Sequence, residues 1–68
     1  SSAETWYNRG TSRLAIGQAR EGLKDLDEAI RLSPRQARFR AVRAQACSMT
    51  GDDARALAEA EAALKLDP

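Results

Sequence analysis

The sequence of 68 residues predicts an all-α protein made of two copies of one helical hairpin. The first observation is a fixed period, which is typical of one supersecondary unit used repeatedly. The second is composition, because alanine and arginine are abundant and both are good helix formers. The third is that glycine and proline fall between the helical stretches. The period is 34 residues. It separates Pro34 from Pro68, Gly17 from Gly51, Leu23 from Leu57, Ala29 from Ala63 and Leu32 from Leu66.

The first hairpin is expected to start with a helix from near Ala3 to Gly17. Ser1 or Ser2 can accept a hydrogen bond from a free amide of the first turn, and Glu4 follows Ser1 at the spacing of a capping box. Gly17 suits the left-handed backbone conformation that follows a helix end. The second helix is then predicted by an apolar stripe at helical spacing, formed by Ala19, Leu23, Leu26, Ala29 and Ile30.

The second hairpin is expected to start at Ser33 and Pro34. Proline disfavours helix in the residue before it and suits the first position of a helix, so Ser33 is predicted to cap a third helix that opens at Pro34 and runs to about Thr50. Gly51 closes this helix, and Asp52 or Asp53 caps the fourth. The inward stripe of the fourth helix is predicted to be Leu57, Ala60, Ala63 and Leu64.

Residues 1–34 and 35–68 are therefore expected to be two repeats of one domain. Asp67 and Pro68 repeat the pattern of Ser33 and Pro34 and announce a further helix. Two repeats are fewer than the roughly three that a stacked array usually needs. We therefore expect a fragment of a longer array, with an unfinished C-terminal end that is a candidate surface for self-association.

Composition narrows the classes of function. Eleven basic and ten acidic side chains give a net charge of +1, so there is no overall field that favours nucleic acid or an anionic membrane. The sequence has no histidine and a single cysteine, Cys47, which is expected to fill space in the core, because no neighbouring group activates its thiol. We expect no catalysis, no metal, no cofactor, no small-molecule substrate and no membrane insertion. A cytoplasmic location is the default expectation.

The period and the residues at the joints resemble the tetratricopeptide repeat. That family's pattern is W-x2-L-G-x2-Y, followed by A-x3-F and a closing proline. Trp6, Gly10, Ala29 and Pro34 match this pattern in the first unit, and the segment LKLDP repeats its ending in the second. The resemblance covers essentially the whole chain and implies tandem antiparallel helix-turn-helix repeats, a four-helix α-solenoid fragment. Arg9, Arg13 and Leu26 depart from it, because they stand where the family has Leu, Tyr and Phe.

The resemblance also implies where a partner binds. In this family the first helix of each unit lines a concave face that holds a peptide. Carried over by register, that face mixes apolar and hydrogen-bonding side chains, which suits a peptide. The resemblance thus implies a noncatalytic scaffold for another protein or peptide, with a site made of Tyr7, Asn8, Thr11, Leu14, Arg38, Val42, Gln45 and Met49.

Two other functions stay open. The units can instead join repeats or subunits without a separate peptide ligand, in which case the same apolar side chains pack against neighbouring helices. RNA binding is a further alternative, because no acidic residue interrupts the stretch between Ile30 and Gly51. Its arginines fan around the helix, however, and acidic residues flank them on both sides, so neutralisation between helices is the simpler interpretation. The arginines of this stretch are Arg31, Arg35, Arg38, Arg40 and Arg43.

Overall fold

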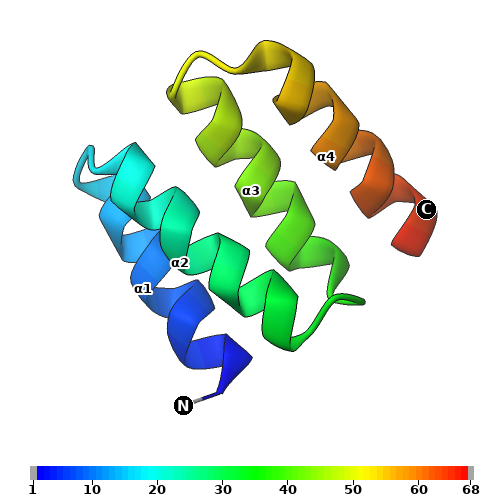
Figure 1. Cartoon of the computed structure of the whole chain (residues 1–68), viewed down its shortest axis with the longest axis horizontal. Coiled ribbons are helices and arrows are strands. Elements are labelled where there is room, and N and C mark those ends of the chain that lie inside the picture. Colours follow the sequence, from blue (N-terminus) through cyan, green and yellow to red (C-terminus); the bar gives the residue numbers. More distant parts are fainter. Residues whose placement is uncertain (1, 68) are drawn as a thin grey trace.

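A computed structural model describes residues 2–67, and within that range the chain forms four α-helices and no strand. The helices are α1 (Ala3–Ala15), α2 (Ala19–Leu32), α3 (Ala37–Met49) and α4 (Asp53–Leu66). They form two antiparallel hairpins that lie side by side, with α2 packed against α3 (Figure 1). The result is a flat body of 28 × 28 × 15 Å. The prediction of an all-α chain with four helices in two hairpins is therefore confirmed.

The predicted cap of the first helix is confirmed, and so are the predicted glycines and cap at the two hairpin turns. Gly17 and Gly51 both have positive φ, +86° and +88°, in the left-handed region that glycine adopts without strain. Ser2 caps α1 by accepting a hydrogen bond from the amide of Thr5, and Asp52 caps α4 by accepting one from the amide of Arg55. Ser1 and Pro68 lie outside the described residues.

The prediction for the start of the third helix is wrong. Ser33 follows the last residue of α2 as its C-terminal cap, Pro34 lies in a turn, and α3 begins only at Ala37 with Gln36 as its cap. Ser33 has φ −144° and ψ 78°, outside the helical region, which a following proline disfavours. Proline therefore ends a helix here without starting the next one. Asp67, the counterpart of Ser33 in the second hairpin, is likewise the C-terminal cap of α4.

The core lies where α2 meets α1 and α3. Leu26 and Ala29 are fully buried, Ile30 is buried, and Phe39 of α3 fills the space beside them at 1% exposure. Cys47 is also fully buried, which confirms its predicted packing role. The large apolar side chains of α2 thus form the centre of the molecule.

The predicted inward stripe of α4 is only half right. Ala63 is buried and Ala60 is half-buried, but Leu57 and Leu64 are 64% and 62% exposed. Their counterparts in α2, Leu23 and Ile30, are covered, because α3 packs over α2. Among the described residues, no helix packs in the same way over α4. The apolar residues of α4 do share a helical spacing, but half of them face outward.

The closest approach between helices is at two glycines. A Cβ atom at Gly10 would lie 3.1 Å from the carbonyl oxygen of Gly22, and one at Gly22 would lie 2.7 Å from that of Gly10. Glycine is therefore required where α1 crosses α2. The corresponding crossing of α3 and α4 has Ala44 and Ala56 instead.

Candidate functional site

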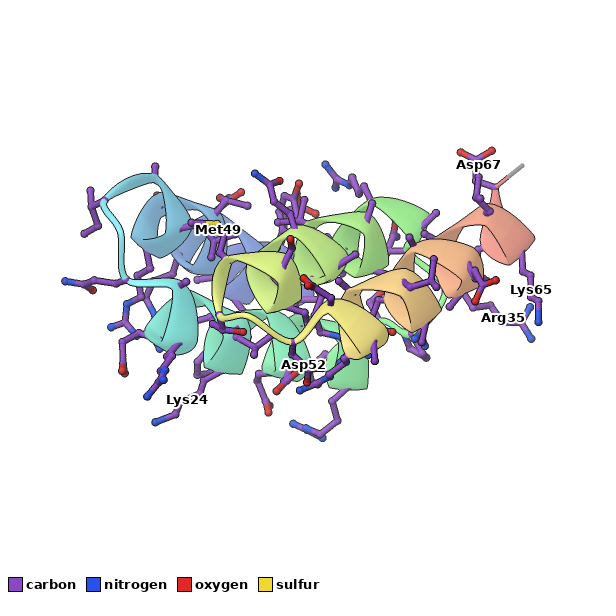
Figure 2. All side chains as sticks on the ribbon, turned by 90° about the horizontal axis from the view of Figure 1, so that it is seen from above. Lys24, Arg35, Met49, Asp52, Lys65 and Asp67 are labelled. Carbon is purple, nitrogen blue, oxygen red and sulfur yellow. The ribbon has the colours of Figure 1, made fainter. Side chains whose placement is uncertain are left out.

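A shallow groove runs between α1 and α3. Its volume is about 220 Å³, and six side chains line it, three from each helix. The two helices touch only sparsely, because both pack mainly on their hairpin partners, and the groove is the space left between them. In Figure 2, Met49 lies on the upper face of the molecule, whereas Lys24 of α2 projects from the lower face. The lining residues are Thr11, Leu14 and Ala15 of α1, and Val42, Gln45 and Met49 of α3.

The floor of the groove is apolar. Leu14 is buried at 8% exposure and forms a cluster with Leu26 and Ala46, against which Val42 packs. The rim carries polar and flexible side chains. The Thr11 hydroxyl donates to the carbonyl oxygen of Asn8 at 2.9 Å, Gln45 is exposed, and Met49 is 48% exposed. The groove therefore offers an apolar floor between hydrogen-bonding edges.

Five of the eight predicted site residues line this groove: Thr11, Leu14, Val42, Gln45 and Met49. The other three, Tyr7, Asn8 and Arg38, do not line it.

Tyr7 and Arg38 take part in packing between the hairpins. The ring of Tyr7 stacks on that of Phe39 with centroids 4.6 Å apart. The guanidinium of Arg38 lies 5.2 Å from the Tyr7 centroid and donates two hydrogen bonds to the Glu4 carboxylate, at 2.6 and 2.8 Å. Asn8 is exposed. These contacts join α1 to α3 at one end of the groove.

Most arginines of the arginine-rich stretch are neutralised by nearby carboxylates. Its ion pairs are Arg31 with Glu28, Arg38 with Glu4, Arg40 with Glu59, and Arg43 with both Asp27 and Glu59. Burial lowers the pKa of Arg43, but its hydrogen bonds to Glu59 and Asp27 outweigh that effect and raise the pKa overall. Arg38, Arg40 and Arg43 are thus neutralised between helices, as the simpler of the two interpretations predicts, whereas Arg31 is paired within α2.

The same ion pair occurs in both hairpins. Arg9 binds Asp25 through two hydrogen bonds, at 2.9 and 3.1 Å, and Arg43 binds Glu59 at the same sequence separation. Asp25 and Glu59 are 2% and 7% exposed, and each of these buried carboxylates is paired with two arginines, Asp25 also with Arg13 and Glu59 also with Arg40. Arg9 and Arg43 are therefore partners of buried carboxylates at equivalent positions of the two hairpins. The sequence signal for this pair is an acidic residue 16 positions after an arginine in both units.

Cys47 is buried, and its thiol is poorly activated. Burial raises the pKa of the Cys47 thiol, which makes it a poorer nucleophile at neutral pH. Residues 2–67 contain no group of three or more His, Cys, Asp or Glu side chains placed to hold a metal ion. None of the four helices is long and apolar enough to cross a bilayer.

The comparisons with known proteins do not extend this description. No protein-family model matches the chain, and no curated protein matches it in sequence. The fold and the groove therefore define the protein only as a pair of stacked helical hairpins with an open surface between their first helices.

Proposed function

We propose that the chain is a noncatalytic scaffold of tetratricopeptide-like repeats, whose α1–α3 groove binds a segment of another protein. The observation that carries this proposal is that five side chains chosen by repeat register lie around one groove. The repeated ion pair supports the repeat interpretation, because the same contact recurs at equivalent positions of both hairpins.

The groove suits a peptide better than a small molecule. Its volume of about 220 Å³ is below the roughly 300–1,000 Å³ typical of small-molecule pockets. One apolar side chain of a bound segment would rest on Leu14 and Val42. The hydroxyl of Thr11 and the amide of Gln45 would serve the backbone of that segment, which needs both donors and acceptors. A contact of this size predicts weak, transient binding.

The test is selection of peptides from a phage-displayed library of random linear sequences on the immobilised chain. The best peptide is then titrated into the ¹⁵N-labelled protein, and amide shift changes are expected at Thr11, Val42 and Gln45. Gln45→Ala should weaken binding by about fivefold to tenfold, the effect of losing one hydrogen bond. Gln18→Ala, an exposed glutamine outside the groove, is the matched control. Shift changes confined to other surfaces, or equal binding by Gln45→Ala, would overturn the proposal.

Self-association is a second candidate function, favoured by the exposed leucines of α4. Leu57 and Leu64 are apolar side chains that a second copy would cover. Sedimentation at increasing concentration separates the candidates. A monomer that captures library peptides supports the scaffold, and a dimer whose groove residues become protected supports a structural joint.

RNA binding has less support, because the arginines that would contact phosphates are already paired with carboxylates. Retention of the chain on single-stranded RNA at low salt, lost as salt is raised, would revive that alternative.

A further inference from the structure

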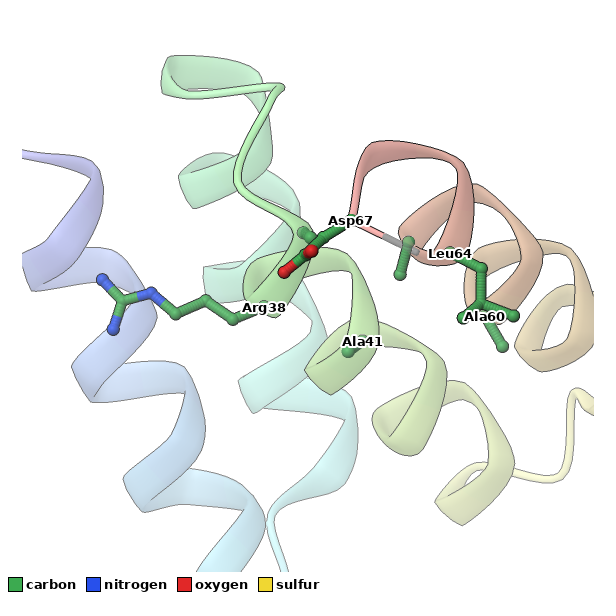
Figure 3. Close-up of a pocket in the computed structure, with 7 residues that line it drawn as sticks. Arg38, Ala41, Ala60, Leu64 and Asp67 are labelled. Atoms are coloured by element: carbon green, nitrogen blue, oxygen red, sulfur yellow. The ribbon is translucent and has the colours of Figure 1, made fainter.

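Every charged side chain of α1 and α3 is already paired with an opposite charge among the described residues. None of these side chains lines the α1–α3 groove, whose lining consists of apolar, hydroxyl and amide side chains. Figure 3 shows the Arg38 side chain extending from α3 toward α1, where it pairs with Glu4. The two helices therefore leave the groove between them electrically neutral. The pairs are Glu4 with Arg38, Arg9 and Arg13 with Asp25, and Arg40 and Arg43 with Glu59.

The first charges beyond the groove come in both signs. Glu4 and Arg38 lie at one end and are bound to each other. At the other end, Met49 also lines a polar hollow of about 410 Å³, whose charged residues are Arg20 and Glu21. One positive and one negative side chain at each end give no net field along the groove. A segment is therefore not attracted to the groove by a charge of either sign.

Neither a further hairpin nor a second copy stacked in the same way would fill this groove. α3 packs on α2 but touches α1 only sparsely, which is why the groove exists. A hairpin added by the same step would pack on α4 and leave the space between α1 and α3 as it is. The groove is thus open to a segment that is not part of the stack.

We propose that the α1–α3 groove selects a segment of another protein that is uncharged where it lies in the groove, with one apolar side chain as its anchor. This inference rests on the proposed function and adds the chemical class of the segment. A carboxylate or an ammonium group over Leu14 and Val42 would lose water and find no opposite charge free to pair with it. This loss costs more for a charge than for a neutral polar group, so charged segments of both signs are rejected.

The polar side chains of the groove fit neutral amide and hydroxyl groups. The Thr11 hydroxyl donates its hydrogen to the carbonyl oxygen of Asn8, so toward a ligand it acts as an acceptor. The exposed Gln45 amide carries two donors and one acceptor. A backbone, asparagine or glutamine N–H of the segment therefore fits Thr11, and either kind of neutral group fits Gln45. The flexible thioether of Met49 adapts to anchors of different shape.

The test compares peptide selections on three forms of the full chain: wild type, Gln45→Glu and Gln45→Lys. Enriched clones from a phage-displayed library of random linear sequences are made as peptides with capped ends. Those that shift the amides of Thr11 and Val42 in the ¹⁵N-labelled chain are compared with the unselected library. Wild-type peptides should be depleted in both acidic and basic residues. Gln45→Glu should select basic peptides and Gln45→Lys acidic ones, because each variant supplies an unpaired charge that the groove lacks.

A matched pair of controls adds the same charges outside the groove. Ala58→Glu and Ala58→Lys change an exposed position of α4 and should select the same neutral peptides as the wild type. Gln45 is also exposed, so its variants should fold, which circular dichroism checks.

Two titrations of the tightest wild-type peptide give the magnitude. Aspartate in place of the polar residue next to its anchor should weaken binding about fivefold or more, and Gln45→Lys should recover part of that loss. The Kd of the original peptide should change by less than about twofold between about 0.05 and 0.5 M NaCl, because no ion pair forms across the contact.

The outcomes separate this inference from the proposed function. Wild-type peptides that shift the groove amides but are enriched in one sign of charge, or that bind several-fold more weakly at high salt, would overturn the inference and leave the scaffold in place. Groove binding by the two charged variants alone would also overturn it. Absence of groove binding by all three forms, or a concentration-dependent dimer that protects the groove amides, would overturn both.

Discussion

Replacing Gly22 with alanine should destabilise the protein, although alanine is the better helix former. The added methyl carbon would lie 2.7 Å from the carbonyl oxygen of Gly10 and 3.0 Å from Cδ2 of Leu14. Ordinary van der Waals contact for such an atom begins near 3.4 Å. The nearest obstacle is backbone, which cannot rotate aside, so α1 must move away from α2 by several tenths of an ångström.

Two opposing terms set the magnitude. Overpacking of a tight contact costs about 1–3 kcal/mol. The higher helix propensity of alanine returns up to about 1 kcal/mol. With an overpacking cost in the middle of that range, the expected net loss in the free energy of unfolding is about 1 kcal/mol, which corresponds to a fall in Tm of roughly 4–8 °C for a domain of this size.

The assay is urea and thermal unfolding followed by far-ultraviolet circular dichroism. Ala56→Gly is the matched control, because Ala56 holds the same position in the second hairpin. It should lose only about 0.5–1 kcal/mol, through helix propensity alone. If Gly22→Ala is as stable as the wild type or more stable, α1 and α2 do not cross at these glycines and the packing described above is wrong.

Three further predictions concern the core and the charges. Phe39→Ala should lose about 3–5 kcal/mol, comparable to the whole stability of a domain this small, so its circular dichroism at 25 °C should be that of an unfolded chain; a helical spectrum would contradict the packing of Phe39. Cys47, fully buried and with a raised pKa, should react with iodoacetamide at neutral pH far more slowly than in urea, and equal rates would show that the core is open. A hydrogen bond from Arg31 lowers the pKa of Glu28 below its ordinary value of 4.5, so this pair stabilises the fold above that pH, and the contribution is lost as pH falls through the lowered pKa. Urea midpoints of wild type and Glu28→Gln should converge in acid, and a constant difference at all pH values would refute the link to this carboxylate.

Local rules predict the four helices and most of their ends. Gly17 and Gly51 mark helix ends because few other residues tolerate positive φ, and Asp52 marks a helix start because its carboxylate can reach a free amide. The prediction for the start of the third helix fails for a physical reason. A proline after a helix is compatible both with a new helix and with a turn, and only the packing of α3 against α2 decides between them.

The burial of α4 could not be predicted from its own sequence. Leu57 and Leu64 have the helical spacing of a core stripe, but burial depends on whether another helix packs over them. The groove is predicted better at one end than at the other. Repeat register locates Leu14 and Val42, but it gives no sign that Arg38 is paired with Glu4. That pair depends on the spacing between hairpins, which no local pattern encodes.

The ion pairs of Arg43 have a consequence for the kinetics of recognition. This one side chain on α3 joins Asp27 of α2 to Glu59 of α4, and Arg38 adds a link from α3 to α1. The two hairpins are thus braced against rotation before any ligand arrives. If the groove between α1 and α3 binds a segment as proposed above, that segment meets a surface of fixed width and loses little entropy in shaping it. Its association rate should then be set by encounter and orientation, with no slow opening step before capture.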